Sequence, residues 1–339
     1  MAGIEDVARR AGVSASTVSY VLSGRRPISE PTRQRVLEAV AALNYRPHPG
    51  ARALASQRTR VIGLVMPLRP DVDVSVIMQF VAGVVTRARF HDHDVLILTG
   101  DDPDAIPRAG AGLVDALVVM DVESDDARLP ALRTMRQPSV LIGLPAHADG
   151  LTCIDVDFEA AGRLAVAHLH AHLTSSHLQA TGGRRVALVG SPPAVLERHT
   201  SYADRMLRGV TDEAARLGVD LQTAACEASF ADGVRTTTDL LERWPDLAGF
   251  VVHNEAATEG VLTAIAAAGR RLGDDTHVVV VGPRSMVARH GPSVATIDLP
   301  GRRIGSSAVD LAMAALAGQG RPTVHLVAPD LMVEGTVTP

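Results

Sequence analysis

The pattern of apolar residues along the chain changes once, near residue 60. Before that point, apolar residues recur every three or four positions in three stretches, at residues 4–11, 15–22 and 30–43. This spacing predicts three amphipathic helices and no strand. Gly12 ends the first stretch, and Ser14 can cap the second. The first part of the chain is therefore predicted to be a small helical domain.

After residue 60, short apolar runs alternate with longer amphipathic stretches. The runs predict strands at residues 61–66, 95–98, 116–120, 140–143, 186–190, 250–252 and 278–282. The amphipathic stretches predict helices at residues 76–90, 158–173, 203–217, 236–241, 258–268 and 303–316. Valine-rich runs separated by helices indicate parallel sheets that are covered on both faces. We therefore predict an α/β core of two doubly wound subdomains, with a ligand cleft beyond the carboxyl ends of the strands.

Charge divides the chain at the same place. The 339 residues carry a net charge of −5. Residues 1–60 hold ten arginines and four acidic residues, a balance of +6, so the remainder holds 23 basic and 34 acidic residues, a balance of −11. The chain contains no lysine, so every fixed side-chain cation is an arginine. A basic head on an acidic body suits binding to a polyanion such as DNA, although a solvated charged face would show the same balance.

The composition and the motifs weigh against several other classes of protein. Hydrophobic residues make up 46% of the chain, and no apolar run is long enough to span a bilayer or to serve as a signal peptide, so we expect a soluble cytoplasmic protein. Cys153 and Cys226 are too few for a disulfide framework or a zinc site. Neither a phosphate-binding loop nor a nucleophile elbow is present, and His168 and His172 are better explained as solvent-facing residues. We expect no catalytic residue, no cofactor and no metal.

A helix, a tight turn at Gly12 and a second helix from Ser14 form the pattern of a helix-turn-helix. A generic three-helix bundle would have similar apolar spacing. The residues themselves closely resemble the lactose-repressor (LacI/GalR) family of transcriptional regulators. The matching segments are residues 4–24, 28–29, 32–33, 43–47, 51–54 and 61–65, with a weaker match across the rest of the chain.

This resemblance implies how the head would contact DNA. Ala15, Ser16 and Tyr20 occupy the positions that contact bases, whereas the neighbouring positions contact phosphates. The implied phosphate contacts are Ser14, Thr17, Ser19, Arg25, Arg26 and Arg46. Residues 50–56 resemble the hinge helix of the family, which includes Ala51 and inserts a leucine, here Leu54, into the minor groove. The alternatives are core packing for Tyr20, ordinary solvated arginines, and an ordinary linker leucine.

The remainder of the chain resembles the periplasmic-binding-protein-like core of the family. The resemblance implies a head at residues 1–47, a hinge helix and linker at 48–60, and an effector-binding and dimerisation core at 61–339. Within the core we expect an N-subdomain at about 61–157 and 293–320, and a C-subdomain at about 158–292 and 321–339.

The resemblance also implies which residues would line an effector cleft. They are Asp71, Asp101, Asp121, Phe158, Arg205, Met206, Asn254, Glu255 and Arg284. Sugar-binding relatives usually have an arginine at the position of Met206 and an acid at the position of Arg284. Because arginine suits carboxylates and phosphates, we expect an effector with an anionic group and an apolar part. The alternative is that Arg284 turns outward or pairs with Glu255.

Together these observations predict a homodimeric, sequence-specific transcriptional regulator that acts as a repressor. It would bind a near-palindromic operator in double-stranded DNA and respond to a small-molecule effector. A small-molecule receptor or enzyme on the same two-lobed fold is the alternative from another class, and a regulator without an effector is a third possibility.

Overall fold

The computed structural model describes residues 3–23, 26–45, 58–69, 73–100, 106–107, 112–173 and 185–333. The chain divides into two compact units, residues 1–59 and residues 60–339, which we call the head and the core. Each unit is described by itself below. Among the described residues, no helix is both long and apolar enough to cross a membrane.

The head is a bundle of three helices, as its apolar spacing predicts. The helices are α1 (Ile4–Ala11), α2 (Ala15–Ser23) and α3 (Glu30–Ala42). Val7, Val18 and Val36, one from each helix, are fully buried against one another. Gly12 ends α1 with a φ of 66°, a left-handed conformation that glycine adopts at little cost. The turn and the shared apolar centre fix the orientation of α2 relative to α1 and α3.

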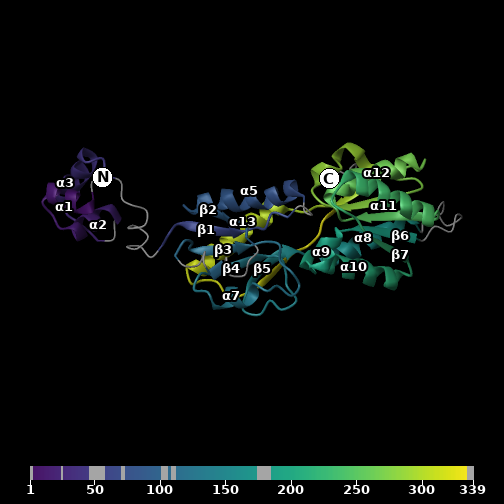
Figure 1. The fold of residues 1–339 in the computed structure, drawn as a ribbon, viewed down its shortest axis with the longest axis horizontal. Helices are drawn as coiled ribbons and strands as arrows, with labels where there is room; N and C mark the ends of the chain where they lie inside the picture. The colour runs from purple at the N-terminus through teal and green to yellow at the C-terminus, as the bar shows by residue number, and fades with distance from the viewer. Residues whose placement is uncertain are drawn as a thin grey trace, which may run out of the picture. The chain divides into compact units, whose positions relative to one another are not determined.

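The first lobe of the core, the N-lobe, contains a six-stranded parallel sheet with the strand order β11-β5-β4-β3-β1-β2. Its strands are β1 (Val61–Val65), β2 (Asp94–Leu98), β3 (Ala116–Val119), β4 (Ser139–Ile142), β5 (Thr152–Val156) and β11 (Val324–Val327). Helices α5 (Val74–Phe90) and α13 (Gly301–Leu316) lie side by side over one face, and α7 (Leu129–Thr134) covers the other (Figure 1). A Cβ atom on Gly83 would lie 2.1 Å from the Arg302 carbonyl oxygen, so the close approach of α5 and α13 requires glycine.

The second lobe, the C-lobe, contains a six-stranded sheet with the order β12-β10-β9-β8-β6-β7, in which only the β10–β12 pair is antiparallel. Its strands are β6 (Arg185–Gly190), β7 (Asp220–Ala225), β8 (Leu247–Val252), β9 (His277–Val281), β10 (Val294–Ile297) and β12 (Leu331–Met332). Helices α8 (Phe158–Leu173) and α10 (Ser201–Leu217) cover one face, and α11 (Phe230–Arg243) and α12 (Thr258–Ala267) cover the other (Figure 1). The short α9 (Pro193–Glu197) follows β6, and single-turn helices η2 (Glu255–Ala257), η3 (Arg284–Met286) and η4 (Ala288–Ser293) lie in the connections. The predicted α/β core with two doubly wound sheets is confirmed.

The later crossings between the lobes differ from the expected boundaries at residues 293 and 321. Val294–Ile297 pairs with β9 in the C-lobe, and Val324–Val327 pairs with β5 in the N-lobe. The chain therefore leaves the C-lobe after β10 and returns to it only with β12. Strands of four residues carry too little pattern to indicate which sheet they join, because that choice depends on pairing with distant strands.

Candidate functional site

The first turn of α2 presents a cluster of hydroxyl groups. The Thr17 backbone N–H donates to Ser14 Oγ at 3.2 Å, and the Ser14 hydroxyl lies 2.8 Å from that of Ser16 and 2.9 Å from that of Thr17. Ser14 and Ser16 are exposed. Exposed hydroxyls at the amino end of a helix are well placed to donate to a phosphate or a base edge.

Tyr20 lies one turn further along α2 and is half-buried. The guanidinium of Arg26 lies 5.4 Å from the centre of its ring. Tyr20 is therefore not part of the buried centre of the head, and it places a ring and a cation next to each other. Ser19 is also half-buried, whereas Ala15 packs partly against the apolar centre. The predicted contacts Arg25, Arg46, Ala51 and Leu54 lie outside the described residues.

In the core, a cavity lies at the carboxyl ends of β6 and β8. It is lined by Asp73, Ser191, Pro192, Tyr202, Ala228, His253, Asn254, Glu255 and Ala256. Asp73 begins α5 of the N-lobe, where its carboxylate accepts from the Ser75 N–H at 2.7 Å, and the other lining residues belong to the C-lobe. The space for solvent is about 20 Å³, which is room for about one water molecule. Both lobes thus contribute to one small polar cavity, at the place where the topology predicts a ligand cleft.

Asn254 lines this cavity, but its amide is used to hold the strand ends together. Its Nδ2 donates to the carbonyl oxygens of Cys226 at 2.6 Å and Gly190 at 3.3 Å, and its Oδ1 accepts from the Ala257 N–H at 3.2 Å. Both amide hydrogens are therefore engaged. Asn254 shapes the cavity more than it offers a hydrogen bond to a ligand.

Glu255 also lines the cavity, and its carboxylate has no arginine or histidine partner among the described residues. Burial, together with the charge of Asp73, raises the pKa of Glu255 to about 7, although a backbone hydrogen bond opposes this. A half-buried carboxylate in a narrow cavity with no cation beside it is costly to ionise. Near neutral pH this group therefore divides between its acid and its carboxylate forms.

Three aromatic rings meet beside the cavity. Phe158, the first residue of α8, has its ring centre 5.4 Å from that of His253 and 5.7 Å from that of Tyr202. His253 and Tyr202 lie 5.5 Å apart, edge to face. His253 is 5% exposed, and burial lowers its pKa to about 4, so its imidazole is neutral. Phe158 thus supports the cavity wall from behind.

A second, apolar cavity of about 80 Å³ adjoins the first and shares Ser191 and His253 with it. Its other lining residues are Leu188, Gly190, Leu196, Ala203, Met206, Leu207, Thr223, Ala224 and Ala225. Met206 is 1% exposed and faces this second space, so the residue at the usual arginine position enlarges the apolar wall.

Arg205 and Arg284 do not line either cavity, in contrast to the expectation from sequence. Arg205 is buried and donates to Asp155 at 2.9 Å, with Asp157 at 3.5 Å, so it joins α10 to the end of β5 where the chain crosses between lobes. Arg284 is exposed, and its backbone N–H donates to Asp298 at 3.1 Å. The anionic group expected for the effector therefore has no guanidinium to meet at either position.

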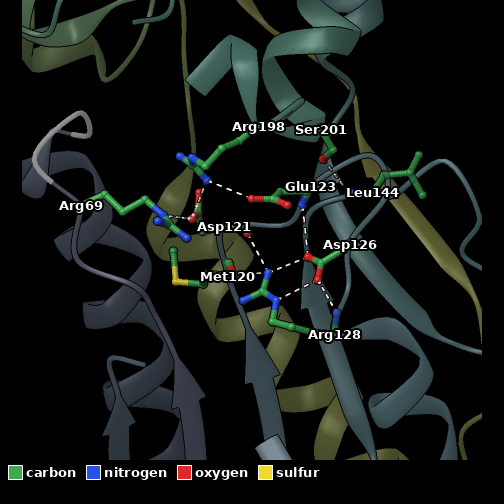
Figure 2. Close-up of polar contacts among 9 residues, drawn as sticks. All are labelled: Arg69, Met120, Asp121, Glu123, Asp126, Arg128, Leu144, Arg198 and Ser201. Carbon is green, nitrogen blue, oxygen red and sulfur yellow. Dashed lines mark hydrogen bonds and ion pairs between the residues drawn. The ribbon is translucent and has the colours of Figure 1, made fainter. Parts of the chain in front are cut away.

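Asp121 also lies outside the cavity, because two arginines bind its carboxylate. Figure 2 shows Arg69 and Arg198 reaching Asp121 from the two lobes, with N–O distances of 2.9 and 3.1 Å. Arg198 continues to Glu123 at 3.3 Å. Below this group in Figure 2, Arg128 binds Asp126 and the Asp121 carbonyl oxygen, which holds the loop in place.

Backbone hydrogen bonds join the same two segments. The Ser201 N–H donates to the Val122 carbonyl at 2.9 Å, and the Ser124 N–H donates to the His199 carbonyl at 2.7 Å. Glu123 and Thr200 form an antiparallel bridge between these bonds. We call residues 121–124 together with 198–204 the clasp. The clasp ties the lobes together by ion pairs and by backbone at once.

Seven residues that line the polar cavity were not predicted from sequence, and four of them have polar side chains, namely Asp73, Ser191, Tyr202 and His253. Ser191 and His253 directly follow β6 and β8, so the rule that ligands lie beyond the carboxyl ends of parallel strands could have indicated both. The predicted Asp71 and Asp101 lie outside the described residues. Within the described part of the chain, no group of three or more His, Cys, Asp or Glu side chains could hold a metal ion. His168 and His172 pack on each other with ring centres 4.4 Å apart, and are half-buried rather than solvent-facing.

Two family descriptions match the chain. Residues 3–48 match bacterial regulatory proteins of the lacI family, and residues 175–337 match the periplasmic binding protein-like domain. The regulator AglR of Rhizobium meliloti is 29% identical over 289 residues, which are 81% of this chain and 76% of that protein. Catabolite control protein A of Streptococcus mutans is 25% identical over 316 residues, or 90% of this chain and 89% of that protein. The lac repressor dimer bound to operator and the anti-inducer ONPF has a TM-score of 0.81 at 24% identity, covering 100% of this chain and 99% of that one.

The helical head, the two-lobed core and these matches define a DNA-binding transcriptional regulator and not an enzyme. The chain belongs to the LacI family and carries the periplasmic-binding-protein-like domain of that family.

Proposed function

We propose that this regulator represses transcription as a homodimer on a near-palindromic operator, and that a small molecule in the cleft between the lobes controls it. The observation that carries the proposal is the polar cavity to which both lobes contribute side chains. A ligand held there changes how the lobes close, and closure changes the affinity for DNA by a coupling free energy. The solved lac repressor dimer holds both an operator and an anti-inducer, which supports a regulator that binds DNA and a small molecule at the same time.

In this proposal residues 1–47 contact DNA, and residues 48–60 connect them to the rest of the chain. Ser14, Ser16 and Thr17 donate to phosphates or base edges at the amino end of α2, where their hydroxyls cluster. Tyr20 contacts a base through its ring edge or hydroxyl. Arg26, which lies over that ring, contacts a phosphate. Residues 61–339 bind the effector and the second subunit.

An apolar surface of the N-lobe supports homodimerisation. Val74, Met78 and Val85 recur along one side of α5 and are 44–53% exposed. Leu96 and Ile97 are 37% and 44% exposed on β2, which is an edge strand of its sheet. Exposed apolar side chains gathered on adjacent elements mark an interface, and a twofold dimer would bury the surface against its own copy.

Selection of bound fragments from genomic DNA, followed by footprinting of the intact protein, tests the proposal. We expect protection of two half-sites about one helical turn apart, and an affinity that falls steeply with salt because arginines replace counterions on phosphates. Equal affinity for the selected fragment and a scrambled duplex at moderate salt would show that the protein does not bind a specific operator.

Substitution of Tyr20 separates base reading from phosphate binding. Tyr20→Ala should change the preferred base at one position per half-site, at about 1–3 kcal/mol. Arg26→Gln is the matched control, since loss of a phosphate contact should weaken all sequences alike. Competition binding against a set of single-base operator variants measures both effects. An unchanged base preference in Tyr20→Ala would remove Tyr20 from the reading surface.

A further inference from the structure

Two acidic side chains line the polar cavity, and among the described residues no arginine does; its histidine, His253, is neutral because burial lowers its pKa to about 4. Asp73 enters from the N-lobe and Glu255 from the C-lobe. Since the chain has no lysine, only arginine could balance them. The arginines predicted to line the cleft are Arg205, which is paired with Asp155, and Arg284, which is exposed. The negative charge of the cavity is therefore not balanced from within these walls.

Glu255 and His253 are the polar groups that remain available to a ligand. Among the described residues, the Glu255 carboxylate accepts a hydrogen bond from its own backbone N–H but has no arginine or histidine partner. The His253 ring contacts the rings of Phe158 and Tyr202 and lines both cavities. His253 is nevertheless 95% buried, since its exposed fraction is 5%. Because the imidazole lines both cavities, a molecule that enters them can hydrogen-bond to it.

The sizes of the two cavities indicate how such a molecule is built. The polar cavity has room for about one water-sized group, whereas the adjoining apolar cavity of about 80 Å³ is four times as roomy. An ammonium group is close to a water molecule in size, and a hexose ring with its hydroxyls is far larger. Tyr202 adds an aromatic ring beside the polar cavity, and aromatic faces attract cations.

We propose that the effector is a primary amine with an apolar substituent. Its ammonium group lies between Asp73 and Glu255, and its apolar part passes His253 into the cavity lined by Leu188, Leu196 and Met206. This inference rests on the proposed function only in taking the cleft as the effector site. It replaces the anionic effector expected from Arg284 with one of opposite charge.

Matched sets of small molecules test the charge of the ligand on the intact protein. Each set contains an amine, an alcohol and a carboxylate on the same apolar group, for example pentylamine, pentanol and pentanoate, and the phenethyl counterparts. Ligand-induced shifts in melting temperature rank the members, and calorimetric titration gives their dissociation constants. We expect an amine to give the largest shift in each set and to bind at least tenfold more tightly than its alcohol.

Two variants locate the binding. Glu255→Gln removes one carboxylate charge at nearly constant shape and should weaken amine binding at least tenfold. Glu227→Gln is the matched control, because Glu227 is exposed, does not line the cavity and changes the net charge equally. Ala203→Leu, which fills part of the apolar cavity, should remove the advantage of longer amines over shorter ones while leaving the shortest amines unaffected.

Three outcomes would overturn the inference: a carboxylate or a neutral sugar gives the largest shift, the Glu255→Gln variant binds amines as tightly as the wild type, or none of the amines changes the melting temperature at millimolar concentration. Operator affinity, measured with and without ligand, separates this inference from the proposed function. An amine that binds without changing operator affinity contradicts effector control but leaves the amine inference standing. A neutral sugar that changes operator affinity supports the control and contradicts the amine.

Discussion

Two groups of carboxylates lie between the lobes. The carboxylates of one group are paired with arginines, and those of the other are not, among the described residues. In the clasp, Asp121 is held by Arg69 and Arg198, and at the crossing strand Asp155 is held by Arg205. In the polar cavity, Glu255 faces Asp73 and has no cationic partner among the described residues. A carboxylate paired with an arginine of the other lobe joins the two lobes, whereas one without such a partner is available to a ligand. Whether an acidic residue has an arginine partner, and not whether it is Asp or Glu, therefore decides if it joins the lobes or can bind a ligand.

The largest effect should follow from breaking the buried pair at the crossing strand. Arg205→Met leaves Asp155 buried without its cation, which should lower the free energy of unfolding by about 3–5 kcal/mol. Arg208→Met is the control on the same helix, since Arg208 is 59% exposed and 3.9 Å from Glu159. Denaturant unfolding of both variants measures the difference. Equal stability of the two variants would mean that the Arg205 pair does not hold the crossing.

A smaller effect, of opposite sign, is expected at the unpaired carboxylate. The pKa of Glu255 is about 7 in the folded protein, above its ordinary value near 4.5, so folding favours its protonated form. The stability this provides is fully present below about pH 4.5 and is lost as pH rises through 7. Glu255→Gln should therefore be more stable than the wild type at pH 8, by on the order of 2 kcal/mol, and the gain should vanish near pH 4.5.

Unfolding curves from pH 4.5 to 8.5 measure this dependence, with Glu227→Gln as the control for an exposed acid. A stability difference between the wild type and Glu255→Gln that does not change with pH would show that the Glu255 carboxylate is not shifted. The comparison with the clasp would then fail, because Glu255 would have an unrecognised partner.

The smallest effect should follow from removing one arginine of the clasp. Arg198→Gln removes contacts to Asp121 and Glu123, but Arg69 still binds Asp121 and the backbone bonds of Ser201 and Ser124 remain. We expect a loss of about 1 kcal/mol in the free energy of unfolding, as for a partly exposed ion pair. A loss above about 3 kcal/mol would instead identify Arg198 as the main support of the clasp.

The apolar pattern predicted the helices of the head and most strands of the core, because both depend on local periodicity. The family resemblance indicated Asn254 and Glu255 after a strand, and both line the cavity. The direction and partner of a side chain depend instead on distant residues. Arg198 and Asp121 are 77 positions apart, and Arg205 and Asp155 are 50 apart, so neither pair was visible in the sequence.

Resemblance to sugar-binding relatives had a similar limit. It located Arg284 and Met206 at positions that often contact a ligand, and so favoured an anionic effector. In the structure Arg284 is exposed, and Met206 enlarges the apolar cavity. A substitution at a ligand position can be recognised from sequence, but the charge of the cavity depends on all its walls, including Asp73 from the other lobe.

In this account the Glu255 carboxylate, which has no cationic partner among the described residues, binds the ammonium group of the ligand. The number of protons released when the ligand binds tests this most directly. Calorimetric titration of the tightest amine at pH 7, repeated in two buffers that differ in ionisation enthalpy, gives this number. Because the pKa of Glu255 lies at about 7, part of its carboxyl population is protonated at pH 7, and an ammonium group should expel a fraction of a proton per site. The wild type and Glu227→Gln should release this fraction, and Glu255→Gln should release none. Equal proton release in wild type and Glu255→Gln would contradict the account.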